Sequence, residues 1–381
     1  MQQSPLLEQF DWFFTSVNWS NTFPNTLALP LARTTSDHIP CKVSIGTSIP
    51  RSNIFCFENF WPEHPGFFEI VQAAWSKPTR RTDSALTLST KFKRLRYDLK
   101  YWSKKLSNLA MLIEKCNKMI FYMDSLEECR RLTDPEWNFR VIIKNHLSSL
   151  LKYRKIYWQK RYTVNRIRFG DECTKFFHTM ATVNFRRNAI SSLRDDHGNI
   201  ITDHDGKAAL LYVAFKNRMG ITTQPEMQFD LHSLINVDVY LSFLVQPFTR
   251  DEIDLLVRKL PVDKAPGPNG FNGLFIKKCW NVIKEDFYKL CEDFFSLLVN
   301  LESINSSFIT LVAKVHSPET VNDYRPISVL NMDIKLLTKL LADRLHMVIL
   351  QLLHANQYGF IRTRTIQDCL AWCFEYIHQC Q

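Results

Sequence analysis

The 381 residues are enough for two or three domains, and the apolar content of 45% and charged content of 23% are ordinary for a globular protein. Only 10 glycines stand against 28 phenylalanines, which argues against a turn-rich all-β protein. No apolar run approaches the roughly 18 residues of a membrane helix, and the N-terminus lacks the pattern of a secretory signal. The ten cysteines include no CxxC pair, which favours free thiols in a reducing compartment. We expect a nuclear or cytoplasmic protein that is not secreted and has no membrane partner.

Positive charge is concentrated between residues 77 and 170, where 23 Lys and Arg stand against 8 Asp and Glu. The whole chain has a net charge of +10, so the remainder is slightly acidic. A basic block of this kind indicates a polyanionic partner, with nucleic acid as the first candidate. A solvated basic helix without any ligand explains the charge equally well.

The N-terminal half predicts short strands followed by long helices. Residues 1–50 contain short strand-like runs broken by prolines, and residues 51–84 are rich in aromatic side chains. From Phe92 to Met123, apolar residues alternate at spacings of three and four, which predicts one unbroken helix with a heptad seam. A second helical run covers residues 136–168 after a break near Pro135. Because a single seam is unstable alone, the two runs are expected to form an antiparallel hairpin.

The C-terminal half alternates turns with amphipathic helices. A β-hairpin is expected around the turn Asp196-His-Gly-Asn, followed by a helix over 207–218 and a linker over 221–246. Thr249 and Glu252 form the pattern of a capping box. Helices are expected over 275–298 and 333–353, and the leucine stripe of the latter is assigned to the core.

Two groups of possible zinc ligands are rejected on spacing. His178 and His197 have no second pair at ligand distance. The other group lies within one predicted helix and lacks paired spacing; it consists of Cys369, Cys373, His378 and Cys380.

The most specific stretch is Ile309 to Leu345, where an apolar strand ends at Lys314 and the sequence Asn-Asp-Tyr-Arg-Pro-Ile-Ser from Asn322 leads into a helix. By themselves, Lys314 and Arg325 are a surface pair flanking a hairpin. With the motifs around them, the segment resembles the fingers of a reverse transcriptase from a non-LTR (LINE-type) retrotransposon, most like the plant elements. The resemblance implies that Lys314 and Arg325 hold the phosphates of the incoming nucleotide, a task that suits paired cations on a rigid hairpin.

Further motifs occur in the order that this resemblance implies. Residues 264–270 read KAPGPNG where the family has KAPGPDG, so Asn269 replaces an Asp. Ala313 stands where the family usually has Pro. The family pattern NQxGFxxGRxxxD, which contacts template or primer, is matched at Gln357, Gly359, Phe360, Arg364 and Asp368. Thr363 replaces its Gly, so the backbone must differ if that Gly needs a positive φ.

The segment from Trp158 to His178 resembles the region just before the polymerase in plant LINE proteins. Its arginines, interleaved with tyrosines, suit phosphate binding with base stacking, although the aromatic residues are equally typical of a core. The expected nucleic-acid contacts are Lys264, Gln357, Gly359, Phe360, Arg364, Arg154, Lys160, Arg161, Arg166 and Arg168.

Ser36-Asp-His-Ile-Pro40 matches the SDHxP motif at the C-terminal end of the endonuclease/exonuclease/phosphatase domain in these elements. The resemblance implies a catalytic His38 oriented by Asp37. The upstream metal-binding Glu and its partners have no counterpart here, so both residues are expected to be relics.

The combined prediction is a mainly α fold with α+β parts: an endonuclease remnant (1–50), a connector (51–84), a basic helical linker with the hairpin (85–220), a linker (221–246) and truncated reverse-transcriptase fingers (247–381). No Tyr-x-Asp-Asp occurs in the sequence, so we expect a catalytically inactive polymerase fragment without a cofactor of its own, whereas the parent enzymes would need Mg²⁺.

Two alternatives stay open. One is a non-enzymatic protein that binds RNA or DNA through the basic linker, in a salt-sensitive manner. The other is a pseudogene product that never folds stably. Other copies of the retroelement protein are a further candidate partner.

Overall fold

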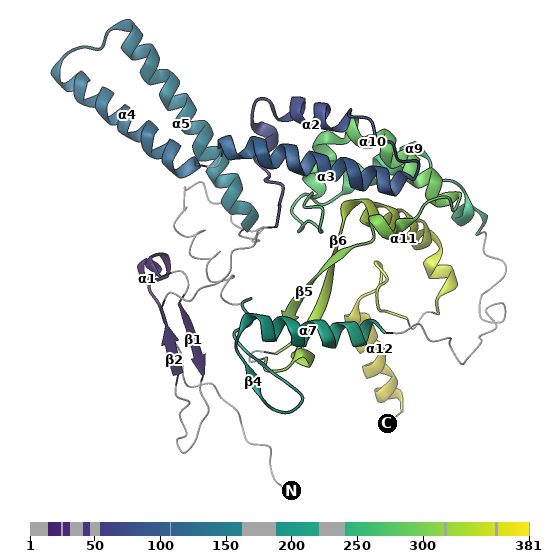
Figure 1. Cartoon of the computed structure of the whole chain (residues 1–381). Helices are drawn as coiled ribbons and strands as arrows, with labels where there is room; N and C mark the ends of the chain where they lie inside the picture. The colour runs from purple at the N-terminus through teal and green to yellow at the C-terminus, as the bar shows by residue number, and fades with distance from the viewer. Residues whose placement is uncertain are drawn as a thin grey trace. The chain divides into compact units, whose positions relative to one another are not determined.

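The computed structural model describes residues 14–23, 26–30, 41–45, 54–106, 108–161, 188–220, 241–315, 318–354 and 357–380. This part of the chain is mostly helical and contains three two-stranded sheets (Figure 1). The expectation of a mainly α fold with smaller β parts is confirmed. The chain forms two compact units. Unit 1 takes in Met1–Phe68, Tyr97–Met219 and Ile309–Ile327, and unit 2 takes in Glu69–Arg96, Gly220–Phe308 and Ser328–Gln381.

The first part of unit 1 contains a short helix and a small sheet. Helix α1 (Val17–Thr22) begins after Ser16, whose side chain accepts a hydrogen bond from the Trp19 N–H. Strand β1 (Leu27–Pro30) pairs antiparallel with β2 (Cys41–Ser44). Short strands were expected in this region. A 3₁₀ turn, η1 (Trp61–Glu63), follows.

Helices α4 (Leu109–Cys129) and α5 (Asp134–Arg161) form the expected antiparallel hairpin in unit 1 (Figure 1). Their shared core is made of apolar residues: Ile113, Cys116, Ile143 and Leu150. At the turn, the Glu136 carboxylate accepts hydrogen bonds from the Thr133 N–H and hydroxyl, which caps α5. Arg140 forms ion pairs with Asp124 and Glu127 across the two helices.

The prediction of one unbroken helix from Phe92 to Met123 is wrong. Helix α3 (Ser84–Ser103) ends in the 3₁₀ turn η2 (Lys104–Leu106), and α4 begins only at Leu109. The reason is that the apolar residues of the seam belong to different cores. Phe92 contacts aromatic rings of unit 2, whereas Ile113 packs against α5 in unit 1.

The rest of unit 1 combines two β-hairpins with a helix. Strands β3 (Leu193–Arg194) and β4 (Ile200–Ile201) pair around the expected turn, where Gly198 has a φ of 86°. Helix α7 covers His204–Met219. Strand β5 (Ser307–Ala313) pairs with β6 (Tyr324–Leu330), and the 3₁₀ turn η5 (Val321–Asp323) lies between them. These elements share a small core of Leu193, Phe215, Val321 and Tyr324.

Unit 2 is built from α2 (Phe67–Trp75, of which residues 69–75 belong here), the first part of α3, η3 (Ser242–Val245), α9 (Arg250–Lys259), α10 (Gly273–Phe295), η4 (Leu301–Ser303), α11 (Met332–Leu352) and α12 (Ile366–Gln379). Phe92 lies at the centre of an aromatic cluster with Trp75, Phe271, Phe275 and Phe287. The Asp286 carboxylate accepts hydrogen bonds from the Trp75 indole at 2.7 Å and from the Lys91 ammonium at 2.7 Å, so α10 is tied to both α2 and α3.

The helix over Met332–Leu352 is confirmed, but its leucine stripe is only partly core. Leu337, Leu340 and Val348 are buried, whereas Leu341 and Leu345 are exposed. The assignment of the whole stripe to the core is therefore wrong. Among the described residues, no helix is long and apolar enough to cross a membrane.

Arg344 links α11 to the start of α9. Its guanidinium is buried and binds the Glu252 carboxylate through two hydrogen bonds of 2.8 and 2.7 Å. It also donates to the Pro247 carbonyl at 2.9 Å and lies 4.3 Å from the centre of the Phe248 ring. Glu252 meanwhile completes the capping box with Thr249 that the sequence predicts.

We expect Arg344→Ala to lower the free energy of unfolding of unit 2 by about 3 kcal/mol, because it leaves Glu252 and the carbonyls around it without their donor. Chemical denaturation followed by circular dichroism measures the change. Lys339→Ala on the same helix removes only a partly exposed pair with Asp343 and should cost less than about 1 kcal/mol. Equal effects of the two substitutions would contradict this account of Arg344.

Candidate nucleotide and nucleic-acid interface

Lys314 and Arg325 lie at the same end of the β5–β6 hairpin. Lys314 directly follows β5, and its backbone N–H donates to the Asp323 carbonyl at 2.7 Å. Its ammonium donates to the Asn322 carbonyl, also at 2.7 Å. Arg325 is the second residue of β6, and both cations are exposed. The two charges are therefore available to an anionic ligand such as a phosphate group.

The turn beside these two cations is held by local hydrogen bonds and by α7. The Asp323 carboxylate accepts from the Thr320 N–H and hydroxyl and from the Glu319 N–H, and these hydrogen bonds lower the pKa of Asp323. The Arg218 side chain on α7 donates to the Asn322 side chain. Tyr324, between Asp323 and Arg325, is buried in the small core with Phe215. Both cations therefore lie on a supported hairpin, that is, one held in place by these hydrogen bonds, by α7 and by the small core.

The turn over residues 264–270 packs against the junction of β6 and α11 in unit 2. A Cβ atom at Gly267 would lie 2.5 Å from the Asn331 backbone nitrogen, so no other residue fits here. The side chain of Asn331 accepts from the Asn269 N–H at 2.8 Å and donates to the Ile304 carbonyl and the Ser306 hydroxyl. Asn331 thus joins three segments that are remote in sequence.

Asn269 fits the turn, although the motif that this segment resembles has Asp at that position. Its side-chain oxygen accepts from the Phe271 N–H at 3.1 Å, as a carboxylate oxygen would. Lys264, at the start of the turn, is exposed.

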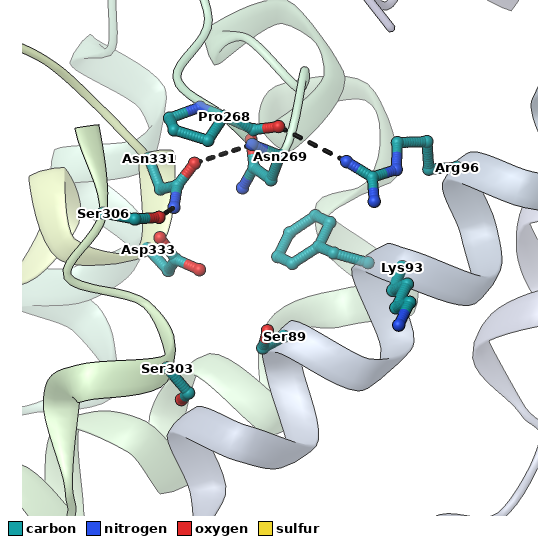
Figure 2. A pocket seen from close by; sticks show the side chains of 10 residues that line it. Ser89, Lys93, Arg96, Pro268, Asn269, Ser303, Ser306, Asn331 and Asp333 are labelled. Atoms are coloured by element: carbon teal, nitrogen blue, oxygen red, sulfur yellow. Dashed lines mark hydrogen bonds between the residues drawn. The ribbon is translucent and has the colours of Figure 1, made fainter. Parts of the chain in front are cut away.

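A polar cavity of about 170 Å³ lies beside this turn (Figure 2). Its wall on α3 carries Ser89, Phe92, Lys93 and Arg96, and the opposite wall carries Asn331 and Asp333. Arg96 donates to the Pro268 carbonyl at 3.4 Å. Burial raises the pKa of the Asp333 carboxyl to about 7. Sequence reasoning missed this cavity because its residues come from four distant segments that share no motif.

Arg364 holds the loop over 357–364, which lies in the segment that matches the pattern NQxGFxxGRxxxD. Its guanidinium donates to the His354 carbonyl at 2.8 Å and to the Gln357 carbonyl at 2.6 Å. The Gln357 amide in turn donates to the Gly359 carbonyl at 3.3 Å. Thr363 does not have a positive φ, whereas Phe360 in the same loop has a φ of 64°. Gln357, Gly359 and Phe360 are all exposed.

Two basic residues at the end of α5, Lys160 and Arg161, form hydrogen bonds and ion pairs with other residues of unit 1. Lys160 donates to the Phe57 carbonyl and lies 3.7 Å from the Glu58 carboxylate, and burial lowers the pKa of Lys160. Arg161 pairs with Glu58 at 2.9 Å and covers the Tyr157 ring at 3.4 Å. Arg154 is half-buried, and its Nε has no hydrogen-bond partner among the described residues.

Several predicted site residues lie outside the described residues. These are Asp37 and His38, which were predicted to be relics of an endonuclease, the arginines Arg166 and Arg168, and most of the segment that runs to His178. Their predicted functions stay predictions. Within the described part of the chain, no three His, Cys, Asp or Glu side chains gather closely enough to hold a metal ion.

The site so described is a cationic hairpin and a set of exposed loops on a helical protein. No protein-family model matches the chain. The chain is similar to the transposon TX1 uncharacterized 149 kDa protein of Xenopus laevis, with 21% identity over 352 residues. The matched region covers 87% of this chain and 26% of that protein, so the chain spans about a quarter of the relative's length. The similarity thus relates the chain to a transposon protein.

Asp333 should make the stability of unit 2 depend on pH. Its pKa of about 7 in the folded protein lies above the value of about 4 in an unfolded chain, so the folded state binds the proton more tightly. The free energy of unfolding should therefore fall as pH rises from about 4 to about 7, by at most about 4 kcal/mol. Denaturant titrations of wild type and Asp333→Asn across this range isolate the effect. If the difference in the free energy of unfolding between the two proteins does not vary with pH, Asp333 is not the cause of the pH dependence.

Proposed function

We propose that the chain is of the reverse-transcriptase (RNA-directed DNA polymerase) lineage of non-LTR retrotransposons, and that its β5–β6 hairpin binds nucleotide triphosphate. The observation that carries this proposal is the pair of exposed cations, Lys314 and Arg325, at one end of a supported hairpin. A triphosphate carries several negative charges, and two exposed cations at one end of the hairpin would offset part of that charge without leaving a buried charge. The order of the motifs and the similarity to the TX1 protein support the same lineage.

These 381 residues alone are expected to bind rather than to polymerise. Nucleotidyl transfer uses two divalent ions held by carboxylates, and the Tyr-x-Asp-Asp motif that supplies such carboxylates is not in this sequence. The parent enzyme would use Mg²⁺ at that motif. In such an enzyme, the residues matching Lys314 and Arg325 would orient the phosphates for chemistry performed at that motif.

Binding of a fluorescent nucleotide triphosphate tests the proposal. Lys314→Ala and Arg325→Ala should each weaken binding by about 10-fold or more, because each removes a charge-assisted hydrogen bond. Fluorescence anisotropy with and without Mg²⁺ measures the affinity. Lys118→Ala is the matched control, since Lys118 is an exposed lysine that pairs with Glu114 on its own helix. Wild-type binding that equals that of both hairpin variants would overturn the proposal.

A second candidate function is binding of RNA or DNA by the α4–α5 hairpin. Lys115, Lys144 and Lys155 are exposed and form no ion pair within the described part of the chain, whereas Lys160 and Arg161 are occupied by Glu58. The rings of Phe121 and Trp137 are exposed on the same hairpin. Unpaired cations beside exposed aromatic rings suit a single strand of RNA or DNA, because its phosphates and its bases are both accessible.

Salt titrations of RNA and DNA affinity test this second function. The logarithm of the affinity should fall linearly with the logarithm of the salt concentration. The double variant Lys144→Gln, Lys155→Gln should reduce the slope by about 1.5 to 2, because two phosphate contacts are lost. Lys289→Gln, an exposed lysine of α10 paired with Asp293, should leave the slope unchanged. Binding that is indifferent to salt would exclude the hairpin as a nucleic-acid interface.

A further inference from the structure

The polar cavity beside the 264–270 turn is lined by residues of unit 2 alone (Figure 2). Two of its lining groups, the Asn269 amide nitrogen and the Ser303 hydroxyl, are buried and have no hydrogen-bond partner among the described residues. The Ser89 hydroxyl faces the same space from α3. Buried polar groups without hydrogen bonds are rare in folded proteins because each is costly. Two of them around one cavity indicate an occupant that pairs with both.

The turn fixes the direction of the Asn269 amide. Its side-chain oxygen accepts from the Phe271 N–H at 3.1 Å, so the NH₂ group is the end that faces the cavity (Figure 2). An amide NH₂ group donates hydrogen bonds and accepts none. A ligand beside Asn269 must therefore supply an acceptor.

Positive charge lies on the α3 side of the cavity. Lys93 is exposed and Arg96 is half-buried, and neither forms an ion pair with a residue that the structure describes. Arg96 donates to the Pro268 carbonyl at a long 3.4 Å and has further N–H groups for a ligand. These cations and the Asn269 amide together form a wall of donors, which suits an anion with several oxygen atoms.

Asp333 is the acidic side chain of the cavity lining. It is 2% exposed, and the Ile334 N–H donates to its carboxyl at 2.9 Å. One of its carboxyl oxygens points into the cavity (Figure 2). Burial raises the pKa of Asp333 to about 7. Below that pH the protonated carboxyl can donate to an anion, whereas above it the ionised carboxylate repels one.

The size and charge of the cavity limit the ligand. A volume of about 170 Å³ holds several water-sized groups, but not a phosphate with a nucleoside on each side. Water is the ordinary occupant of a polar cavity, yet it does not offset the charges of Lys93 and Arg96. We propose that the cavity binds a small free oxyanion, phosphate or sulfate, with Asn269 and Ser303 donating to its oxygens and Arg96 offsetting its charge. This inference goes beyond the proposed function and does not depend on it.

Sulfate is the probe for this site, because its charge does not change near neutral pH. Isothermal titration calorimetry of the full chain at constant ionic strength should show one sulfate bound per chain. Asn269→Asp should weaken binding by about 10-fold or more, because one carboxylate oxygen still accepts from the Phe271 N–H while the other repels the anion. Ser303→Ala should weaken it by about 10-fold. Lys289→Gln is the control and should not change the affinity, since Lys289 pairs with Asp293 and lies outside the cavity lining.

The pH dependence of sulfate binding tests the place of Asp333. Wild type should bind sulfate about 10-fold more weakly at about pH 8 than at about pH 6, because the anion favours the protonated carboxyl. The other charged side chains of the lining are Lys93 and Arg96, and none of the lining residues is a histidine. Asp333→Asn should therefore bind sulfate equally at both pH values. A pH dependence that persists in this variant would contradict the site.

Three further results would overturn the proposal. The first is that wild type binds no sulfate at about pH 6. The second is that Asn269→Asp and Ser303→Ala, with circular dichroism spectra that match wild type, bind sulfate as tightly as wild type does; the ion then lies elsewhere on the basic chain. The third is that single-stranded RNA of mixed sequence abolishes sulfate binding, which would assign the cavity to a phosphate of a strand rather than to a free ion.

Discussion

The packing of unit 2 depends on the close approach of two backbone segments, at Gly267 and at Asn331. The approach is possible only because Gly267 has no side chain. The buried Asn331 amide then satisfies backbone and side-chain groups from the 264–270 turn and from the segment after η4. Loss of this amide would leave the buried Ile304 carbonyl and the half-buried Asn269 N–H without this partner, which is a costly change in a core. The two most specific motifs of the C-terminal half therefore meet through one side chain.

Cationic side chains perform two different tasks in this protein, and charge counts do not separate them. Lys160 and Arg161 lie in the most basic stretch, yet they hold the segment around Glu58 against α5. Arg364 closes its own loop, and Arg344 is part of the core. By contrast, Lys314 and Arg325 face solvent on a supported hairpin. In the proposed function, exposed cations of this second kind attract a phosphate-bearing ligand, because an ion pair that is already formed gains little from a phosphate.

Features set by neighbouring residues could be predicted from the sequence, whereas features set by distant contacts could not. The α4–α5 hairpin, the β3–β4 turn and the capping box at Thr249 each follow from spacing within a few residues. The break between α3 and α4 depends on Phe92 packing against Phe271 and Phe287, and no local pattern reports those contacts. In the candidate site, too, only the features set by neighbouring residues could be predicted. The motif predicted that Lys314 and Arg325 share a hairpin, but the pairing of Lys160 with the Glu58 segment links residues about a hundred positions apart.

The left-handed backbone at Phe360 is instructive for the same reason. Thr363 in place of the glycine of the pattern predicts only that the backbone differs if that glycine needs a positive φ; no local pattern indicates the positive φ at Phe360. That position is set by Arg364, whose hydrogen bonds to His354 and Gln357 draw the chain into a closed loop. A strained residue without an internal packing partner is then a feature that only coordinates reveal.

The central claim is that this protein binds nucleic acid through exposed surfaces on its hairpins and loops. The most direct test is to crosslink the full chain to RNA that carries 4-thiouridine and to identify the linked peptides by mass spectrometry. The account predicts linked peptides from the loop over 357–364 and from the α4–α5 hairpin, with yields that fall as salt is raised. Crosslinks confined to other described segments, or none at low salt, would contradict it.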